Sequence, residues 1–136
     1  MNDDYRIYIV FRADLPEMTR AKGEVQAAHA AASLIYQCAQ HSAGMDVLHD
    51  YMNYEEGGLS ETGLVHKGQT KINMEVDDLP ALKKICERAI NRNVDFVMIQ
   101  DAAHTVFDAP TITCVGIGPC SKTNGNAITR GARMRI

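Results

Sequence analysis

Two short polar stretches of this sequence carry side chains that could do acid–base chemistry. Lys22, Gln26 and His29 are spaced four and then three residues apart, so they would share one face at the start of a helix. Asp101 and Thr105 belong to a second stretch, DAAHT, which directly follows an apolar run. A carboxylate there could act as a general base toward water, and a lysine nearby could stabilise negative charge that develops in a transition state.

Each stretch also has a purely structural interpretation. The helix face could be solvated with Lys22 pointing outward, and a lone histidine such as His29 is more often packed than catalytic. Asp101 and Thr105 could instead cap backbone amides in a turn. A further option is that Arg20 and Lys22, at a helix N-terminus, bind a phosphate or an oxyanion. The residues alone leave these interpretations open.

Familiar cofactor and metal motifs are not matched. Gly116-Ile117-Gly118 lacks the third glycine of a dinucleotide fingerprint, which would fall at Ser121. Ser121 also replaces the glycine that a phosphate loop needs before its lysine. The five histidines and four cysteines show no zinc-site spacing, and there is no G-x-S-x-G elbow of a serine hydrolase. We therefore expect no metal and no cofactor.

Length and composition indicate one ordinary globular domain over residues 1–136. The 136 residues are 46% hydrophobic and 23% charged, and no apolar run approaches the ~18 residues that would span a bilayer. The cysteines form no C-x-x-C pair, and the acidic start does not look like a signal peptide. These features favour a cytoplasmic protein with reduced thiols and no membrane association.

The charge distribution is uneven along the chain. A formal net charge of −3 argues against a protein that coats nucleic acid with its whole surface. Beyond Asp108, however, the chain has no acidic residue. Its charged side chains there are Lys122, Arg130, Arg133 and Arg135. This basic end could be a local anion-binding stripe or only a solvated edge.

The elements that must position these groups follow from hydropathy periods. Period-2 alternation and apolar runs predict strands over 5–13, 70–76, 94–100 and 111–118. Helical spacing predicts helices over 19–40, over 45–55 and after a cap at Asp77 or Asp78. This order is typical of a small α/β domain with a four-stranded sheet and helices packed on it. Ligands of such sheets bind beyond strand C-termini, which singles out 14–22 and 101–110.

The hydropathy periods also predict which faces of the helices and strands are buried. In the first helix the residues at apolar spacing are Val25, Ala28, Ala32, Ile35, Tyr36 and Ala39. Its alanines would allow close approach to a sheet or to a partner subunit. In the helix after Asp78 the predicted buried stripe is Leu82, Ile85, Cys86, Ala89 and Ile90. The strands at 94–100 and 111–118 are nearly continuous in apolar content, as expected for strands covered on both faces.

Several motifs in the same order resemble those of the type II peptidyl-tRNA hydrolases. The matching segments are YIVFRADL (8–15), TRAK (19–22), QAAHA (26–30), GQTK (68–71), DAAHT (101–105) and GIGP (116–119). They cover most of 5–34 and 68–119. This chain has Ala103 and His104 where the family has glycine and arginine. It also has Thr19 and Ala21 where the family has glycines at the start of the helix.

The resemblance implies an α/β fold with a four-stranded mixed sheet flanked by helices, usually in a homodimer. It implies hydrolysis of the ester that joins a peptidyl or N-blocked aminoacyl group to tRNA, without metal or cofactor. The catalytic positions carried over are Lys22, Gln26, Asp101 and Thr105. The side chains expected to bind the substrate are Arg20, His29, His104, Lys122, Arg130 and Arg133. The alternatives are a non-catalytic member that binds a ligand or a protein, and a hydrolase for another acyl ester or amide.

Overall fold

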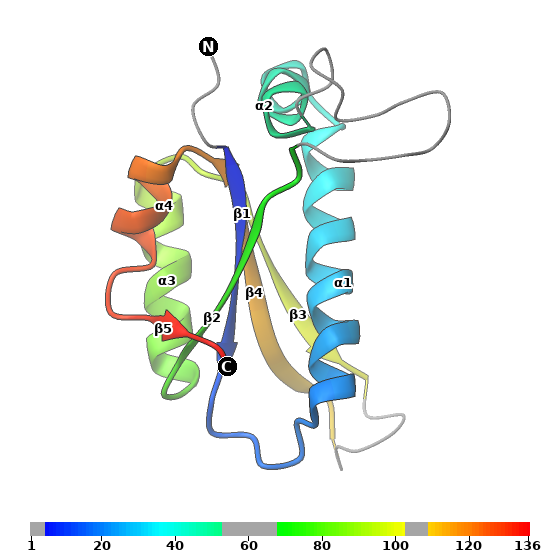
Figure 1. Ribbon diagram of the computed structural model, residues 1–136, viewed down its shortest axis with the longest axis vertical. Helices are drawn as coiled ribbons and strands as arrows, with labels where there is room; N and C mark the ends of the chain where they lie inside the picture. Colours follow the sequence, from blue (N-terminus) through cyan, green and yellow to red (C-terminus); the bar gives the residue numbers. More distant parts are fainter. Residues whose placement is uncertain (1–4, 53–67, 103–108) are drawn as a thin grey trace.

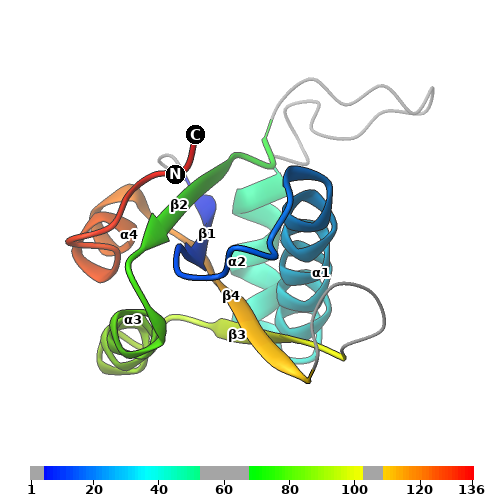
Figure 2. The ribbon, with the colours of Figure 1, turned by 90° about the horizontal axis from the view of Figure 1, so that it is seen from below.

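The computed structural model describes residues 5–52, 68–102 and 109–136, which form a mixed sheet between two layers of helices (Figures 1 and 2). The strands are β1 (Arg6–Arg12), β2 (Lys71–Val76), β3 (Phe96–Asp101), β4 (Thr111–Cys120) and β5 (Arg133–Met134). The helices are α1 (Arg20–Cys38), α2 (Ser42–Met52), α3 (Leu79–Asn91) and α4 (Lys122–Ile128). Among the helices in these ranges, none is long and apolar enough to cross a membrane.

The sheet has the strand order β3-β4-β1-β2-β5. β1 is parallel to β2 and antiparallel to β4, and β4 is antiparallel to β3. The carboxyl ends of β1, β2 and β3 therefore lie at one edge, where α1 also begins (Figure 1). The predicted α/β class with a mixed sheet is confirmed, but the predicted count of four strands is one too low. β5 has two residues, which is too short to give a hydropathy period, and it pairs with the outer edge of β2.

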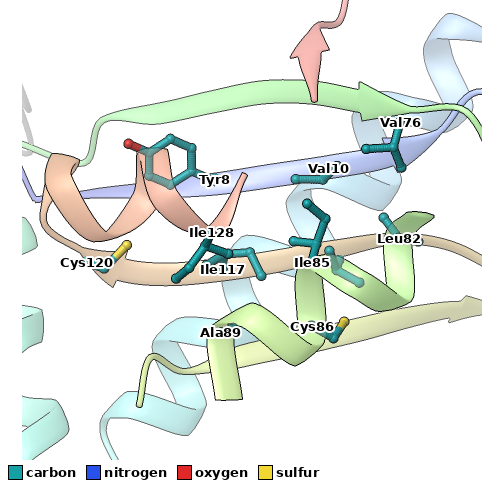
Figure 3. Close-up of a cluster of buried hydrophobic side chains, with 11 residues drawn as sticks. Tyr8, Val10, Val76, Leu82, Ile85, Cys86, Ala89, Ile117, Cys120 and Ile128 are labelled. Atoms are coloured by element: carbon teal, nitrogen blue, oxygen red, sulfur yellow. The ribbon is translucent and has the colours of Figure 1, made fainter. Parts of the chain in front are cut away.

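The alternation along β1 divides the core into two clusters. Tyr8 and Val10 pack against α3 and α4 on one face of the sheet (Figure 3). Ile7, Ile9 and Phe11 pack against α1 and α2 on the other face. All five side chains are at most 2% exposed. Burial of this kind stabilises a fold by about 1.5–3 kcal/mol per large apolar side chain, so β1 anchors both layers.

The face that α1 buries differs from the face that its apolar pattern predicts. Val25 and Tyr36 are 48% and 72% exposed. The buried positions are Gly23, Gln26, Ala30, Leu34 and Cys38. Apolar spacing predicted the wrong face because the buried face includes a glycine and a glutamine, which are not counted as apolar residues.

Two further packing predictions were partly wrong. In α3 the predicted stripe is buried except for Ile90, which is 62% exposed. Strand β4 is buried along most of its length, as predicted, but β3 is an edge strand with Met98 37% exposed. The predicted cap of α3 is confirmed, because the Asp78 carboxylate accepts a hydrogen bond from the Ala81 N–H at 3.0 Å.

Helix α1 approaches β4 closely at Gly116. A Cβ atom at this position would lie 2.8 Å from Leu34 Cδ1 and 3.2 Å from Ala30 Cβ. We expect Gly116→Val to lower the free energy of unfolding by about 1–3 kcal/mol, because the added methyl groups would push α1 away from the sheet. Urea unfolding followed by circular dichroism measures this change. An unchanged midpoint would contradict the close packing of α1 on β4.

Candidate active site

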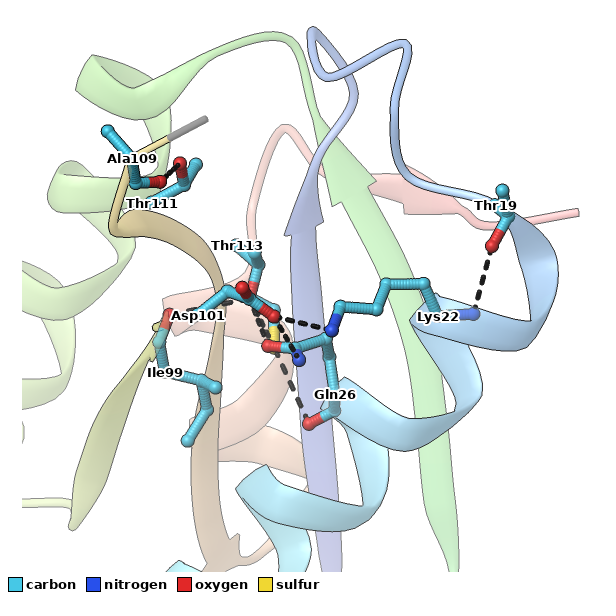
Figure 4. A network of polar contacts seen from close by, with 9 residues as sticks. Thr19, Lys22, Gln26, Ile99, Asp101, Ala109, Thr111 and Thr113 are labelled. Atoms are coloured by element: carbon cyan, nitrogen blue, oxygen red, sulfur yellow. Dashed lines mark hydrogen bonds and ion pairs between the residues drawn. The ribbon is translucent and has the colours of Figure 1, made fainter. Parts of the chain in front are cut away.

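The start of α1 is fixed by a hydrogen bond that caps it. Thr19 precedes the helix in an extended conformation, and its hydroxyl accepts a hydrogen bond from the Lys22 N–H at 3.1 Å. A threonine at this position satisfies one of the backbone donors that the first turn leaves without a partner. The cap places Lys22 in the first turn, and its side chain extends toward the end of β3 (Figure 4).

Lys22 forms an ion pair with Asp101, the last residue of β3. Lys22 Nζ lies 2.6 Å from Asp101 Oδ2, and the two side chains are only 17% and 6% exposed. A carboxylate this deeply buried is stable as an anion only with a charged or hydrogen-bonding partner. The pair joins two segments that are far apart in the sequence.

Gln26 lies one helical turn after Lys22 and contacts the same carboxylate oxygen. Its Nε2 donates a hydrogen bond to Asp101 Oδ2 at 3.2 Å, and its Oε1 accepts one from the Thr113 hydroxyl at 2.7 Å. An ionised carboxylate only accepts hydrogen bonds, so the amide must turn its NH₂ group toward Asp101. Gln26 and Thr113 are 2% and 0% exposed. This network holds the carboxylate of Asp101 in one orientation.

Thr113 is a member of this network that the sequence analysis missed. It lies in β4 among apolar residues and is completely buried. A buried hydroxyl needs a hydrogen-bond partner, so a threonine inside an apolar strand is a signal that could have identified it. Arg135 is absent from the site residues predicted from the sequence, and its side chain packs nearby. Its guanidinium carbon lies 4.1 Å from the centre of the Phe11 ring.

The remaining predicted residues near the start of α1 do not join the network. The side chain of Arg20 is 94% exposed and lies 3.6 Å from Glu24. His29 is exposed, because it lies outside the buried face of α1. Thr105 and His104 lie outside the described residues, so their predicted roles stay predictions.

The predicted basic residues of the C-terminal part are spread around the molecule. Lys122 begins α4, which packs with α3 on the face of the sheet opposite α1 (Figure 2). Arg130 is exposed, and its backbone carbonyl accepts a hydrogen bond from Arg88 at 2.7 Å. Arg133 pairs with Glu75 and Asp77, at 2.9 and 2.7 Å. The structure does not bring these three side chains together at Asp101.

The cysteines are unsuited to nucleophilic catalysis. All four are free and buried. Burial raises the pKa of Cys114 to about 12, and the same cause raises the pKa of Cys38 and Cys120 to about 12 and that of Cys86 to about 11. A nucleophilic cysteine must be a thiolate, whereas these thiols are protonated at neutral pH. Across the described ranges, no three or more histidine, cysteine, aspartate or glutamate side chains are grouped to hold a metal ion.

The loop between β1 and α1 is held by a bidentate ion pair. Arg12 donates to the two carboxylate oxygens of Asp14 at 2.8 and 3.1 Å, and to the carbonyl oxygen of Ile112 at 3.3 Å. These bonds connect the loop that precedes α1 to the first residues of β4. The hydrogen bond from Arg12 lowers the pKa of Asp14, and burial opposes the shift.

This pKa shift predicts a dependence of stability on pH. Because the pKa of Asp14 is lower in the folded state, the pair stabilises the fold above the unfolded-state pKa near 3.8. We expect this contribution to disappear as the pH falls through the lowered value. Unfolding of the wild type and of Asp14→Asn, measured from pH 7 to pH 2, should therefore converge at the acid end. A difference in stability that stays constant with pH would contradict this role.

Fold and site together define a class of small α/β protein. This chain places a buried lysine–aspartate pair at the carboxyl edge of its parallel strands, where sheets of this type bind ligands. The family model described as peptidyl-tRNA hydrolase PTH2 matches residues 5–134. The chain belongs to this family.

Individual relatives agree with the family assignment. The chain is 37% identical over 114 residues to a peptidyl-tRNA hydrolase of Sulfurisphaera tokodaii, covering 84% of each chain. It is 32% identical over 129 residues to a peptidyl-tRNA hydrolase of Saccharolobus solfataricus, covering 95% of this chain and 98% of the relative. Among solved structures, a protein of unknown function from Agrobacterium tumefaciens superimposes with a TM-score of 0.58 over 96% of this chain and 97% of its own. At 16% identity, this last similarity concerns the fold alone.

Proposed function

We propose that this protein hydrolyses the ester bond between tRNA and a peptidyl or N-blocked aminoacyl group, and so releases the peptide and free tRNA. The observation that carries this proposal is the buried contact of 2.6 Å between Lys22 Nζ and Asp101 Oδ2. Both residues match positions of the family motifs, and the relatives described above are named peptidyl-tRNA hydrolases. A non-catalytic binding role is not favoured, because this family assignment and the intact pair both support hydrolysis.

In the proposed reaction, a water molecule attacks the ester carbonyl carbon directly. Asp101 takes a proton from the water as the new carbon–oxygen bond forms, and the carbonyl oxygen becomes an oxyanion. The positive charge of Lys22 stabilises this oxyanion, a contribution of about 3–4 kcal/mol in preorganised sites. The bond to the ribose oxygen then breaks, and this oxygen takes up the proton. No covalent enzyme intermediate is required.

Gln26 acts in this scheme as a positioning residue. Its amide connects Asp101 to the buried Thr113 hydroxyl, so the carboxylate cannot rotate away from the substrate without breaking its hydrogen bond to Gln26 and its ion pair with Lys22. Correct orientation of a reacting group lowers the entropic part of the barrier before the substrate arrives. In this proposal Asp101 is the base and Gln26 is the orienting group.

A deacylation assay tests the proposed function. Purified protein is incubated with N-acetylated aminoacyl-tRNA, and the release of the labelled N-acetyl amino acid is measured. We expect turnover by the wild type and none by the Lys22→Ala and Asp101→Asn variants, all folded as judged by circular dichroism. A folded wild type that is inert would overturn the proposal and favour the binding role. Hydrolysis of simple acyl esters or amides in place of the tRNA ester would favour the other alternative.

We propose that the protein works as a homodimer in the cytoplasm. The exposed apolar side chains of α1, Val25 and Tyr36, support an association surface on this helix. The four free cysteines are compatible with a reducing compartment. Light scattering should give twice the mass of the chain, and Tyr36→Glu should halve it. Ile90→Glu, an equally polar change at an exposed position of α3, is the control and should leave the dimer intact.

A further inference from the structure

Arg135 lies beside the active site, at the end of the chain. The strand β5 pairs with β2, and the Arg135 N–H donates to the carbonyl oxygen of Asn73 at 3.1 Å. These contacts place the half-buried side chain over the Phe11 ring, with 4.1 Å from its guanidinium carbon to the ring centre. Figure 2 shows the C-terminus on the far side of β2 from β1, as the strand order requires, so the Arg135 side chain reaches across β2 to the Phe11 ring.

A glycine in α1 makes room for this guanidinium. A Cβ atom at Gly23 would lie 2.5 Å from Arg135 Nη2 and 2.9 Å from Nη1. The group therefore packs directly on the helix, one residue after Lys22. The positive charge of Arg135 also acts on the buried Cys114 thiol. It lowers the pKa of this thiol and so opposes the larger rise that burial causes. Cys114 directly follows Thr113 in β4.

The described residues leave the guanidinium donors of Arg135 unengaged, although its backbone N–H is bonded to Asn73. Among the described residues, its guanidinium forms no hydrogen bond and no ion pair. It makes a cation–π contact with the Phe11 ring. The guanidinium of Arg12 is paired with Asp14, and that of Arg133 with Glu75. A guanidinium held by an aromatic ring, with its donors unpaired, is preorganised for an anion that takes two parallel hydrogen bonds.

We propose that Arg135 binds a phosphodiester group of the tRNA while Lys22 and Asp101 act on the ester. The proposal rests on the proposed function for the identity of the RNA. A phosphate matches the planar fork of arginine through two of its oxygens. The stacking on Phe11 fixes the side chain before the RNA binds, so little conformational entropy remains to be lost. The contact positions the tRNA so that its ester reaches the buried carboxylate.

Binding of a fluorescently labelled, deacylated tRNA tests this role without any catalytic step. We expect Arg135→Gln to raise the dissociation constant about tenfold, as loss of a hydrogen bond to a charged group does. The slope of log affinity against log salt concentration should fall by about one, as expected for one phosphate contact fewer. The matched control is Arg92→Gln, which removes an arginine that follows α3 and donates to Asn124 at 3.0 Å. This control should bind as the wild type does.

A second variant tests the packing of the Arg135 guanidinium on α1 without changing the charge of the protein. Gly23→Ala adds a methyl group where the guanidinium packs, so it should weaken tRNA binding in the same direction while Arg135 remains. This variant also covers the case in which Arg135→Gln uncovers Phe11 and fails to fold. Wild-type affinity in both variants, or a wild type that binds no tRNA, would overturn the proposal.

Steady-state hydrolysis separates this proposal from the proposed function. With N-acetylated aminoacyl-tRNA, Arg135→Gln should raise KM about tenfold, in line with the weaker binding, and leave kcat near the wild-type value. With an N-acetylated aminoacyl ester of adenosine, which has no phosphate, the variant and the wild type should react equally. Binding that depends on Arg135 in a protein that does not hydrolyse would refute the function alone. Hydrolysis with an unchanged KM in Arg135→Gln would refute the role of Arg135 alone.

Discussion

Asp101→Asn should reduce kcat for N-acetylated aminoacyl-tRNA by about 10²–10⁴-fold, the usual contribution of a positioned general base. Asparagine has nearly the shape of aspartate but does not accept the proton of the attacking water. The KM should change little, because the proposed tRNA contact is made by Arg135 and not by Asp101. Single-turnover deacylation with enzyme in excess measures the chemical step directly.

A matched control for this variant is Asp95→Asn. Asp95 lies just before β3 and contacts Cys38 at 3.3 Å, so the same chemical change is made in a second, partly buried aspartate. This control should keep the wild-type rate. If Asp101→Asn folds and turns over at a rate similar to that of Asp95→Asn, the carboxylate is not the base of the reaction.

Lys22→Met should have two separate effects. It removes the charge proposed to stabilise the oxyanion, so kcat should fall by about 10²–10³-fold. It also leaves the buried carboxylate of Asp101 without its lysine, which should lower the free energy of unfolding by about 3 kcal/mol. Adding Asp101→Asn to Lys22→Met should restore much of the stability, because no unpaired charge then remains buried, but it should not restore activity. Urea unfolding and deacylation rates of the four proteins measure the two effects.

The same variant distinguishes two roles for the lysine. If Lys22 stabilises the transition state, kcat falls, whereas a lysine that only holds a substrate phosphate changes KM alone. A change confined to KM would therefore refute the oxyanion role. Lys84→Met, at an exposed position of α3, provides the control for the loss of one positive charge. Its kinetics and stability should match those of the wild type.

The fold was predictable from the sequence where a helix or strand was long enough to show a hydropathy period. The seven residues of β1 and the thirteen of α3 give clear periods. β1 lies within its predicted range of 5–13, and α3 begins directly after the predicted cap at Asp78. Helix α4 and strand β5, with seven and two residues, are too short to give such a signal. Their positions depend on packing against α3 and on pairing with β2, which are tertiary contacts that local patterns do not contain.

The sequence predicted three members of the network around Asp101 but not the geometry of that network. Helical spacing correctly grouped Lys22 with Gln26, and the family motifs supplied Asp101. The same spacing included His29, which lies just beyond the border of the buried face and points to solvent. That border depends on tertiary contacts, such as those of Gly23 with Arg135 and of Leu34 with Gly116 in β4, and no local pattern reports them. The position of Arg135 depends on β5 and so had no sequence signal.

The network around Gln26 joins residues that are far apart in the chain, since its partners Asp101 and Thr113 lie 75 and 87 positions downstream. During synthesis on a ribosome, α1 therefore emerges long before the strands that complete its chemistry. We therefore expect a nascent chain to be inactive until β4 has left the exit tunnel and packed against α1. The recovery of hydrolytic activity after dilution from denaturant should therefore follow the late formation of long-range contacts. It should not follow the earlier formation of helices.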